Sequence, residues 1–351
     1  MIIRSKAPLR LGLAGGGSDV SPYSDIYGGL VLNATINLYA YCTIEETDDG
    51  QISVNSLDTE TIETYQLVPE LPIDGKAILI KGVYNSIVKD FGNVPSAFKI
   101  TTYSDAPAGS GLGTSSTMVV CILKAFVEWM NLPLGDYEVA RLAYEIERKT
   151  LGLAGGKQDQ YAAAFGGFNY MEFLPNDVVI VNPLKVKRWI IDELEASLLL
   201  YFTGRSRKSA VIISEQQANT SGGNKEAIEA MHKIKKSAVD MKLAVLKGDI
   251  DNFAAILRTA WEDKKKMAKN ITTPHIQEAM DVAMAAGAKA GKVSGAGGGG
   301  FIIFVVEPTR KKEVEKALSA LDGKVAFFQF TEGGAHGWKI YPTDKIEALK
   351  Y

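Results

Sequence analysis

Four short glycine-rich segments interrupt the apolar stretches of this chain and most constrain what it can fold into. They lie at residues 15–17, 109–113, 152–156 and 295–300. Glycine weakens the interior of a helix or strand, but it lets the backbone approach another group closely. A tight turn is enough to explain one glycine-rich segment, but it does not readily explain four. The set therefore predicts backbone packed against a bound ligand.

Size and charge limit the partners that such a chain can have. It has 351 residues, enough for about two domains, and 39 Lys and Arg face 41 Asp and Glu, giving a formal net charge of -2. That balance provides no basic field for nucleic acid or an anionic membrane. No apolar run reaches the ~18 residues of a membrane helix, and the N-terminus lacks the apolar core of a signal peptide. Cys42 and Cys121 lie inside apolar runs, so neither a disulfide framework nor a CxxC metal site is expected. We expect a cytoplasmic protein without nucleic-acid or membrane partners; the sequence leaves its oligomeric state open.

The order of strands and helices favours two α+β lobes over one doubly wound sheet. Strands and helices do not alternate strictly, and the character of the chain changes near residue 190. We therefore expect domains at 1–190 and 191–351. The expected strands are 30–46, 51–55, 61–67, 98–104, 197–203, 301–306 and 325–330. The expected helices are 115–130, with Thr114 or Ser115 as N-cap, 136–149, a nearly unbroken stretch 206–263, and 309–321.

Residues 107–117, PAGSGLGTSST, place glycine and hydroxyl residues directly before a buried helix. Glycine backbone and the free N–H groups of a helix start can cradle a phosphate. The alternative is an ordinary glycine turn with a Ser or Thr cap. The chain has no GxxxxGK[ST] sequence, which disfavours a Walker-type site. Residues 295–300 match GxGxxG, but a strand rather than a helix follows, which argues against a dinucleotide fold.

Two carboxylates lie close to these segments in the sequence. Asp159 follows a glycine pair at the start of an expected helix, where it could accept a proton from a hydroxyl nucleophile or favour the helix N-terminus. Glu147 ends the preceding helix. Together with a serine hydroxyl from residues 114–116 it would suit magnesium, while an ion pair with Arg141 or Arg148 is the alternative.

Three motifs in order resemble those of the GHMP kinase superfamily, small-molecule kinases named for galactokinase, homoserine kinase, mevalonate kinase and phosphomevalonate kinase. They are residues 7–20, the PxxxGLGSSA-like segment 107–116 and the glycine-rich segment 293–300. The resemblance spans essentially the whole chain. It implies an N-terminal nucleotide-binding lobe, a smaller C-terminal lobe and an active site in the cleft between them.

The resemblance also implies roles for individual residues. Asp159 corresponds to the catalytic aspartate and Arg10 to the basic residue beside the reacting hydroxyl, with ATP as phosphoryl donor. Ser115 and Glu147 correspond to the ligands of Mg²⁺. The residues expected to bind ATP are Pro107, Gly109, Ser110, Gly111, Leu112, Gly113, Thr114, Ser115 and Ser116. Those expected to bind the sugar are Gly16, Gly17, Ser18, Asp19, Lys157, Arg205, Gly297 and Gly298.

Departures in the first motif narrow the substrate. Gly16 and Gly17 stand where galactokinase-like enzymes carry Glu-His, while Asp19 keeps the final sugar-contacting aspartate, so galactose is a poor candidate. The chain looks most like the bacterial kinases that phosphorylate D-glycero-D-manno-heptose 7-phosphate at its anomeric hydroxyl, for activated heptose and surface polysaccharide. L-fucokinases, which typically carry Trp at position 17, are the runner-up. A catalytically inactive sugar and ATP sensor and an isoprenoid-pathway kinase are further alternatives, the latter disfavoured because such kinases usually carry Lys at position 10.

Basic residues after the strand 197–203 point to a phosphorylated substrate. Arg205, Arg207 and Lys208 could hold a distal sugar phosphate through two-pronged hydrogen bonds, or form a solvated basic turn. Lys157 could reach a phosphate or pair with Asp159.

Overall fold

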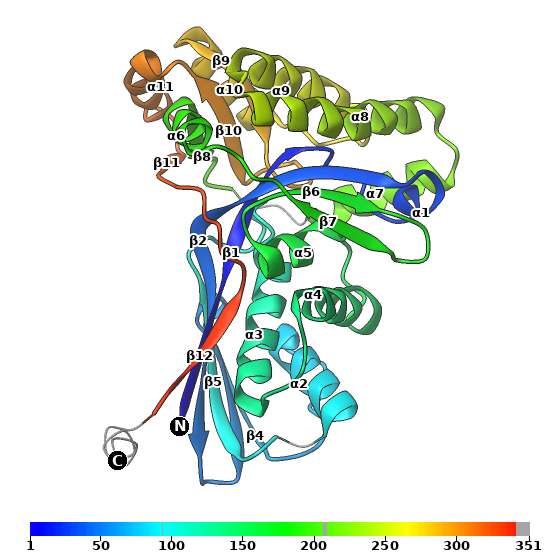
Figure 1. Cartoon of the computed structure of the whole chain (residues 1–351), viewed down its shortest axis with the longest axis vertical. Helices are drawn as coiled ribbons and strands as arrows, with labels where there is room; N and C mark the ends of the chain where they lie inside the picture. Colours follow the sequence, from blue (N-terminus) through cyan, green and yellow to red (C-terminus); the bar gives the residue numbers. More distant parts are fainter. Residues whose placement is uncertain (93, 206–208, 342–351) are drawn as a thin grey trace.

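The computed structural model describes residues 1–92, 94–205 and 209–341, and it contains two β-sheets covered by helices (Figure 1). Strand β2 (Gly29–Thr47) organises the first sheet because it is long enough to pair twice on one edge: its first half pairs with β6 (Phe168–Phe173) and its second with β5 (Ala97–Ser104). Its other edge pairs with β1 (Ile2–Ala14). The remaining strands of this sheet are β3 (Gln51–Ser56), β4 (Thr61–Gln66), β7 (Val179–Pro183) and β12 (His336–Ile340). The expected strands of this half are confirmed.

Helices α2 (Ile78–Phe91), α3 (Thr114–Met130), α4 (Asp136–Tyr144) and α5 (Gln158–Phe165) pack together, with α3 and α5 against the first sheet (Figure 1). Helix α3 is buried on most of its surface, as its apolar sequence predicts. Its N-cap is Gly113, in a left-handed conformation with φ 78°, and not Thr114 or Ser115 as expected. Helix α4 continues as a π-helical turn η2 (Glu145–Thr150), so the expected helix 136–149 is present with a wider last turn.

The second sheet is antiparallel, in the order β11 (Lys324–Ala326), β8 (Leu198–Phe202), β10 (Phe301–Val306) and β9 (Ala288–Val293). Alternate residues of β8 point to opposite sides, as the two-residue period of a strand requires. Leu198 and Leu200 share a core with β1 and with α6 (Arg188–Ser197), α8 (Lys225–Lys247) and α9 (Ile250–Lys264). Leu199 and Tyr201 pack in another core with α10 (Pro274–Ala285) and α11 (Lys311–Leu318).

Two expectations for this half need correction. The stretch 206–263 is not one helix: residues 206–208 lie outside the described part, and α7 (Ser209–Ser221), α8 and α9 follow one another. Asn224 and Asp249 interrupt the helices because their side chains accept hydrogen bonds from Ala227 N and Asn252 N, capping the next helix. The strand expected at 325–330 ends at Ala326, and Phe330 instead bridges to Ile36 of the first sheet.

The two sheets share one apolar interface. Leu9, Leu11 and Leu13 of β1 are fully buried in the same core as Leu257 of α9 and Ile303 of β10. The boundary expected at residue 190 falls inside α6, and β12 returns to the first sheet, so the chain crosses between the sheets more than once. Arg10 of β1 thereby lies between Gly111 of the first half and Ser294 of the second.

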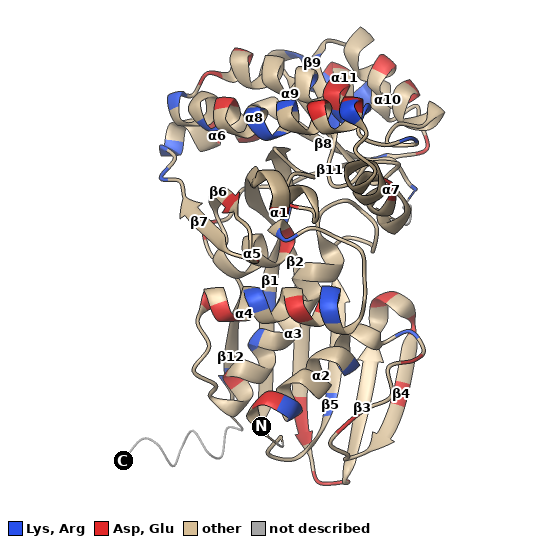
Figure 2. Ribbon diagram, turned by 90° about the vertical axis from the view of Figure 1, so that its right-hand side faces the viewer, with Lys and Arg blue, Asp and Glu red and all other residues tan. Residues whose placement is uncertain are grey.

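The surface carries mixed charge. Figure 2 shows Lys and Arg interspersed with Asp and Glu along the helices that cover the second sheet. In the part of the chain that the structure describes, no helix is both long and apolar enough to cross a bilayer.

Candidate active site

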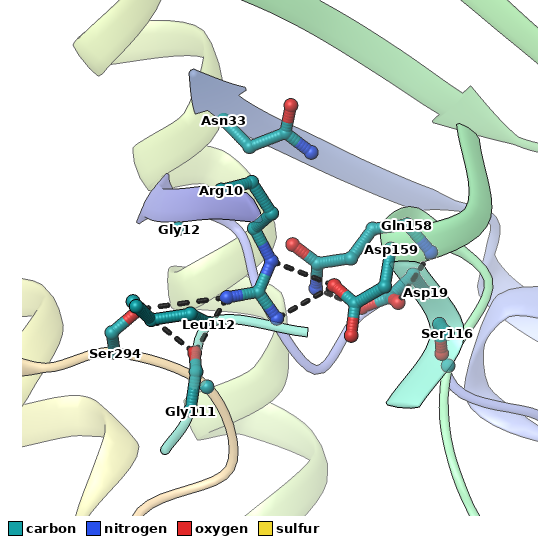
Figure 3. A network of polar contacts seen from close by, with 12 residues as sticks. Arg10, Gly12, Asp19, Asn33, Gly111, Leu112, Ser116, Gln158, Asp159 and Ser294 are labelled. Atoms are coloured by element: carbon teal, nitrogen blue, oxygen red, sulfur yellow. Dashed lines mark hydrogen bonds and ion pairs between the residues drawn. The ribbon is translucent and has the colours of Figure 1, made fainter. Parts of the chain in front are cut away.

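An ion pair between Arg10 and Asp159 lies at the centre of the site (Figure 3). Arg10 is on β1 and only 4% exposed, and Asp159 is in the first turn of α5. The Nε and Nη2 atoms of Arg10 both lie 2.6 Å from Asp159 Oδ1, and Nη1 donates to the Gly111 carbonyl at 2.6 Å. Arg10 therefore joins the carboxylate to the glycine-rich loop 109–113.

Local backbone features bring these groups together. The pairing of β1 with β2 shifts register between Pro8 and Arg10, which re-aims the side chains of this part of the strand. A Cβ atom added at Gly113 would lie 2.9 Å from Asp159 Cγ, and the positive φ there also disfavours other residues. Glycine at 113 thus allows the loop to approach the carboxylate.

Two glycine-rich loops that are distant in the sequence lie against each other. A Cβ at Gly111 would clash with the Ser294 carbonyl, and Ser294 Oγ donates to the Gly111 carbonyl at 3.0 Å. Phe301 N donates to the Ser110 carbonyl at 2.8 Å. Within the first loop, the Ser110 and Thr114 hydroxyls are 3.0 Å apart, and Thr114 Oγ1 donates to the Pro107 carbonyl at 3.4 Å. These hydroxyls stabilise the loop, and none of the side chains that the structure describes caps α3, so the N–H groups of its first turn are available to an anion.

Glu147 lies directly beside the start of α3. It is 1% exposed and sits in the π-helical turn η2. Ser115 Oγ donates to its Oε1 at 2.9 Å, and Ser116 Oγ donates to Oε2 at 2.6 Å. Gln160 Nε2 donates to Oε2 at 2.7 Å, and Arg148 Nη1 pairs with Oε1 at 3.1 Å. The ion pair with Arg148 is therefore present, but it is buried rather than on the surface, and Glu147 also contacts Ser115.

The oxygen set at Glu147 and Ser115 suits a small hard cation. Among the described residues, no group of three or more His, Cys, Asp or Glu side chains is placed to hold a metal ion. Magnesium commonly takes only one or two protein ligands and completes its shell with phosphate oxygens and water. One carboxylate and one hydroxyl at the mouth of the glycine-rich loop fit that pattern.

A cavity opens beside the Arg10–Asp159 pair, between the two halves of the molecule. From the N-terminal half it is lined by Arg10, Gly12, Gly16, Gly17, Asp19, Val20, Gly156, Gln158 and Asp159. From the C-terminal half it is lined by Ile213, Gln216, Lys264, Lys292, Gly295 and Ala296. A substrate in this cavity would touch Asp159 on one side and elements of the second sheet on the other.

Lys264 and Lys292 are cavity residues that the sequence analysis missed. Lys264 Nζ donates to the Gly295 carbonyl, and Lys292 Nζ donates to the Gly12 carbonyl at 2.7 Å. Burial, with a further contribution from Arg10, lowers the pKa of Lys264 to about 8. Burial together with the charges of Lys264 and Arg10 lowers the pKa of Lys292 well below its ordinary value.

Comparison with known proteins identifies the family. Residues 79–167 match the GHMP kinases N terminal domain and residues 241–324 the GHMP kinases C terminal. The D-glycero-alpha-D-manno-heptose 7-phosphate kinase of Campylobacter jejuni is 50% identical over 96% of this chain and 99% of its own. The chain belongs to the GHMP kinase family.

Two other proteins are similar to this chain to different degrees. A crystal structure described as a D-glycero-D-manno-heptose 1-phosphate kinase from Bacteroides thetaiotaomicron has 66% identity and a TM-score of 0.84, covering 97% of this chain and all of that one. The L-fucokinase/L-fucose-1-P guanylyltransferase of Bacteroides fragilis is 27% identical over 91% of this chain, but that match covers 36% of the longer protein. The expected GHMP fold and kinase class are confirmed.

In this GHMP kinase, Asp19 is engaged mainly with the protein itself. Its Oδ1 accepts hydrogen bonds from Gly17 N and Gln158 Nε2, both at 3.0 Å. Its Oδ2 accepts from Lys157 N at 3.0 Å and Gln158 N at 3.1 Å, which caps the N-terminus of α5. The carboxylate therefore fixes the helix that carries Asp159, while the cavity still touches it.

The other amino-acid residues that were expected to bind the sugar do not all lie in this cavity. Gly16 and Gly17 line the cavity, whereas the Ser18 hydroxyl donates to the Gly15 carbonyl at 2.8 Å, accepts from Leu30 N at 3.0 Å and stabilises the loop. Lys157 Nζ pairs with Asp177 at 2.8 Å and Asp25 at 3.2 Å, so the alternative of a pair with Asp159 is wrong.

Arg205 and Gly298 line a different cavity from the one beside Arg10. Arg205 is exposed, and its carbonyl accepts from Gly300 N at 2.9 Å. Gly297 packs on Ile271, where a Cβ would lie 2.9 Å from Ile271 Cγ2. Arg207 and Lys208 lie outside the described residues.

Proposed function

We propose that this kinase transfers the γ-phosphoryl group of ATP to the anomeric hydroxyl of D-glycero-D-manno-heptose 7-phosphate, giving the 1,7-bisphosphate for nucleotide-activated heptose and surface polysaccharide. The observation that carries the reaction type is the Arg10–Asp159 pair between the glycine-rich loop and the cavity. The substrate rests on the 50% identity to the Campylobacter jejuni enzyme over nearly the full length of both chains. ATP and sugar phosphates are held inside the cell, so we place the protein in the cytoplasm.

Phosphoryl transfer needs positioning and charge neutralisation more than covalent catalysis. In the proposed reaction, the anomeric oxygen forms a bond to the γ-phosphorus while the bond to the β,γ-bridging oxygen breaks and ADP leaves. Asp159 orients the hydroxyl and accepts its proton. Arg10 holds that carboxylate and offers positive charge to the phosphoryl group, and the amides of 109–113 with the start of α3 bind the nucleotide phosphates.

We propose that Ser115 and Glu147 hold magnesium at the mouth of the loop. When bound, the ion neutralises charge on the β- and γ-phosphate oxygens. Ser116, Gln160 and Arg148 orient Glu147 through the hydrogen bonds described above, as outer partners of a metal ligand commonly do.

The test is ADP release from ATP and Mg²⁺ with a panel of acceptors. The panel contains D-glycero-D-manno-heptose 7-phosphate, D-glycero-D-manno-heptose 1-phosphate, L-fucose, galactose, mannose and mevalonate. Heptose 1-phosphate is included because the 66% identical relative is named for it. Turnover confined to the 7-phosphate is the expected result. Turnover with L-fucose or heptose 1-phosphate alone would replace the proposed substrate, and silence with every acceptor would favour a sensor.

A distal role for Arg205 follows as a separate proposal. Because Arg205 lies in another cavity, it would reach a substrate phosphate only if the sugar extends past the loop 295–300. Arg205→Ala should then raise the KM for the sugar 7-phosphate at least tenfold and leave kcat nearly unchanged. An equal effect on the unphosphorylated heptose would exclude this role.

A further inference from the structure

Buried lysines in this protein fall into two groups that differ in their partners. Lys81 Nζ is paired with Glu63 at 2.8 Å and Asp74 at 3.0 Å, and Lys157 has Asp177 and Asp25. Each of these ammonium groups therefore has two carboxylates, as expected for a buried charge.

Lys264 and Lys292 form the second group. They are 3% and 4% exposed, yet within the described residues neither makes an ion pair with a carboxylate. Each donates to one backbone carbonyl, although an ammonium group carries three N–H donors. Burying a charge without an ion pair destabilises the folded protein. Stability therefore does not explain why lysine occupies these two positions.

The two carboxylates that line this cavity are already engaged in hydrogen bonds, although the charge of Asp19 still opposes part of the lowering of the Lys264 pKa. Asp159 accepts two hydrogen bonds from Arg10, and Asp19 accepts four from its own loop and from α5. The cavity lining thus holds Arg10, Lys264 and Lys292 against two acidic side chains. In the folded protein the depressed pKa values of both lysines reflect this excess of positive charge as well as burial.

We propose that Lys264 and Lys292 together bind a phosphoryl group inside this cavity. This anion then provides the ion pair that the two ammonium groups do not form with the described carboxylates. The proposal rests on the proposed function and extends it to the C-terminal half of the molecule. Two sources have the required chemistry: the group transferred from ATP, and the phosphate that the sugar already carries.

The position of Lys264 relates the pair to the reacting centre. Its acceptor Gly295 lies against Gly111, where a Cβ on Gly295 would meet Gly111 Cα at 2.7 Å, and Gly111 in turn accepts from Arg10. Lys292, on β9, donates to the carbonyl of Gly12, two residues after Arg10 on β1. The two lysines therefore line the same cavity from α9 and β9.

The experiment compares wild type with Lys264→Met and Lys292→Met, which keep the apolar stem and remove the charge. Calorimetry without ATP measures the Kd of unphosphorylated heptose, heptose 7-phosphate and heptose 1-phosphate. We expect at least tenfold weaker binding of one phosphorylated sugar and no change for the unphosphorylated one. Selective loss of the 7-phosphate assigns the site to the substrate's own phosphate, and selective loss of the 1-phosphate assigns it to the transferred group. Equal changes for all three sugars, or none, would overturn the proposal.

A second measurement separates this proposal from the identity of the sugar. Orthophosphate binding is measured on protein saturated with ADP, which occupies the glycine-rich loop. Wild type and the control Lys81→Met, a buried lysine outside the cavity, should bind phosphate equally, and Lys264→Met at least tenfold more weakly. Equal phosphate affinity in all three proteins would refute the lysine site even if heptose 7-phosphate proved to be the substrate. Weaker phosphate binding by Lys264→Met would support the lysine site even if another sugar phosphate proved to be the substrate.

Discussion

Replacing Lys264 by methionine should stabilise the empty protein. Burial lowers the pKa of Lys264 from the ordinary 10.5 to about 8, and each pKa unit corresponds to about 1.4 kcal/mol, so keeping the side chain charged costs the folded state about 3 kcal/mol. Methionine removes that penalty and also removes the hydrogen bond to Gly295, worth about 1 kcal/mol. The net expectation is a gain of about 2 kcal/mol in the free energy of unfolding at pH 7.

The sign of the pH dependence provides a stricter check. Because the pKa is lower in the folded than in the unfolded state, the unfolded chain binds more protons between about pH 8 and 10.5. The penalty is therefore fully present below pH 8 and fades as the pH rises. The advantage of Lys264→Met over wild type should shrink by about 2 kcal/mol between pH 7 and pH 9.5.

Lys81→Met is the matched control with the opposite sign. Although burial opposes it, hydrogen bonds to Glu63 and Asp74 raise the pKa of Lys81, so its stabilising contribution is present at every pH below 10.5. Its replacement should destabilise the protein by about 2 kcal/mol at both pH values. Urea unfolding followed by circular dichroism measures all three proteins. A Lys264→Met variant that is as destabilised as Lys81→Met at pH 7 would refute the reasoning.

Four further substitutions test the rest of the site. Arg10→Met should lower kcat by about a hundredfold or more, because it removes the charge beside Asp159, and ADP release at saturating substrates measures it; an unchanged kcat would contradict the assigned role. Glu147→Gln should raise the Mg²⁺ concentration for half-maximal rate about tenfold, and an unmoved midpoint in a magnesium titration would exclude Glu147 as a ligand. Gly113→Ala should reduce kcat at least tenfold with little change in sugar Kd, since the new Cβ would lie 2.9 Å from Asp159 Cγ; a wild-type rate would show that the loop need not be so close. Asp19→Asn should reduce stability by about 1 to 2 kcal/mol and affect kcat more than KM, because it weakens the cap of α5; a pure KM effect would instead make Asp19 a sugar ligand.

The sequence could predict the parts of the site that local chemistry marks. The glycine-rich loop 109–113 precedes an apolar helix, and Asp159 follows a glycine pair, so both were identifiable without coordinates. The expected neighbourhood of Glu147 and Ser115 is present, with a distance of 2.9 Å between Oε1 and Oγ. What joins Arg10 to Asp159, 149 residues away, is the packing of α5 beside β1, which no local pattern encodes.

Lys264 and Lys292 show why the other part of the site could not be predicted from the sequence. Lys264 lies directly after the helix expected over 206–263, yet it continues the buried stripe of Phe253, Leu257 and Trp261 along α9. This spacing of buried residues is the sequence signal that could have identified Lys264 as buried. Lys292 stands between a glycine and a valine in a strand buried along almost its whole length, which also marks it as internal. Periodicity can predict that a lysine is buried, but only the tertiary fold shows that, within the described part of the chain, it forms no ion pair with a carboxylate.

The loss of the predicted single helix over 206–263 and of the strand beyond Ala326 has another cause. Local signals mark both breaks in the helix: Asn224 follows Gly222 and Gly223, and Gly248, left-handed with φ 70°, ends α8 directly before Asp249. Residues after Ala326 leave the second sheet because Phe330 pairs with Ile36 of the first. The helix breaks are therefore local, whereas the end of the strand is set by a contact between distant segments.

In the proposed mechanism, Asp159 acts on the anomeric hydroxyl of a sugar held between the two halves of the molecule. The most direct measurement compares wild type with Asp159→Asn, using ADP release with heptose 7-phosphate for turnover and calorimetry for binding of each substrate. The account predicts ATP and sugar Kd values within a few-fold of wild type and a kcat reduced by about a thousandfold or more. A variant that binds both substrates and keeps most of the wild-type kcat would contradict it.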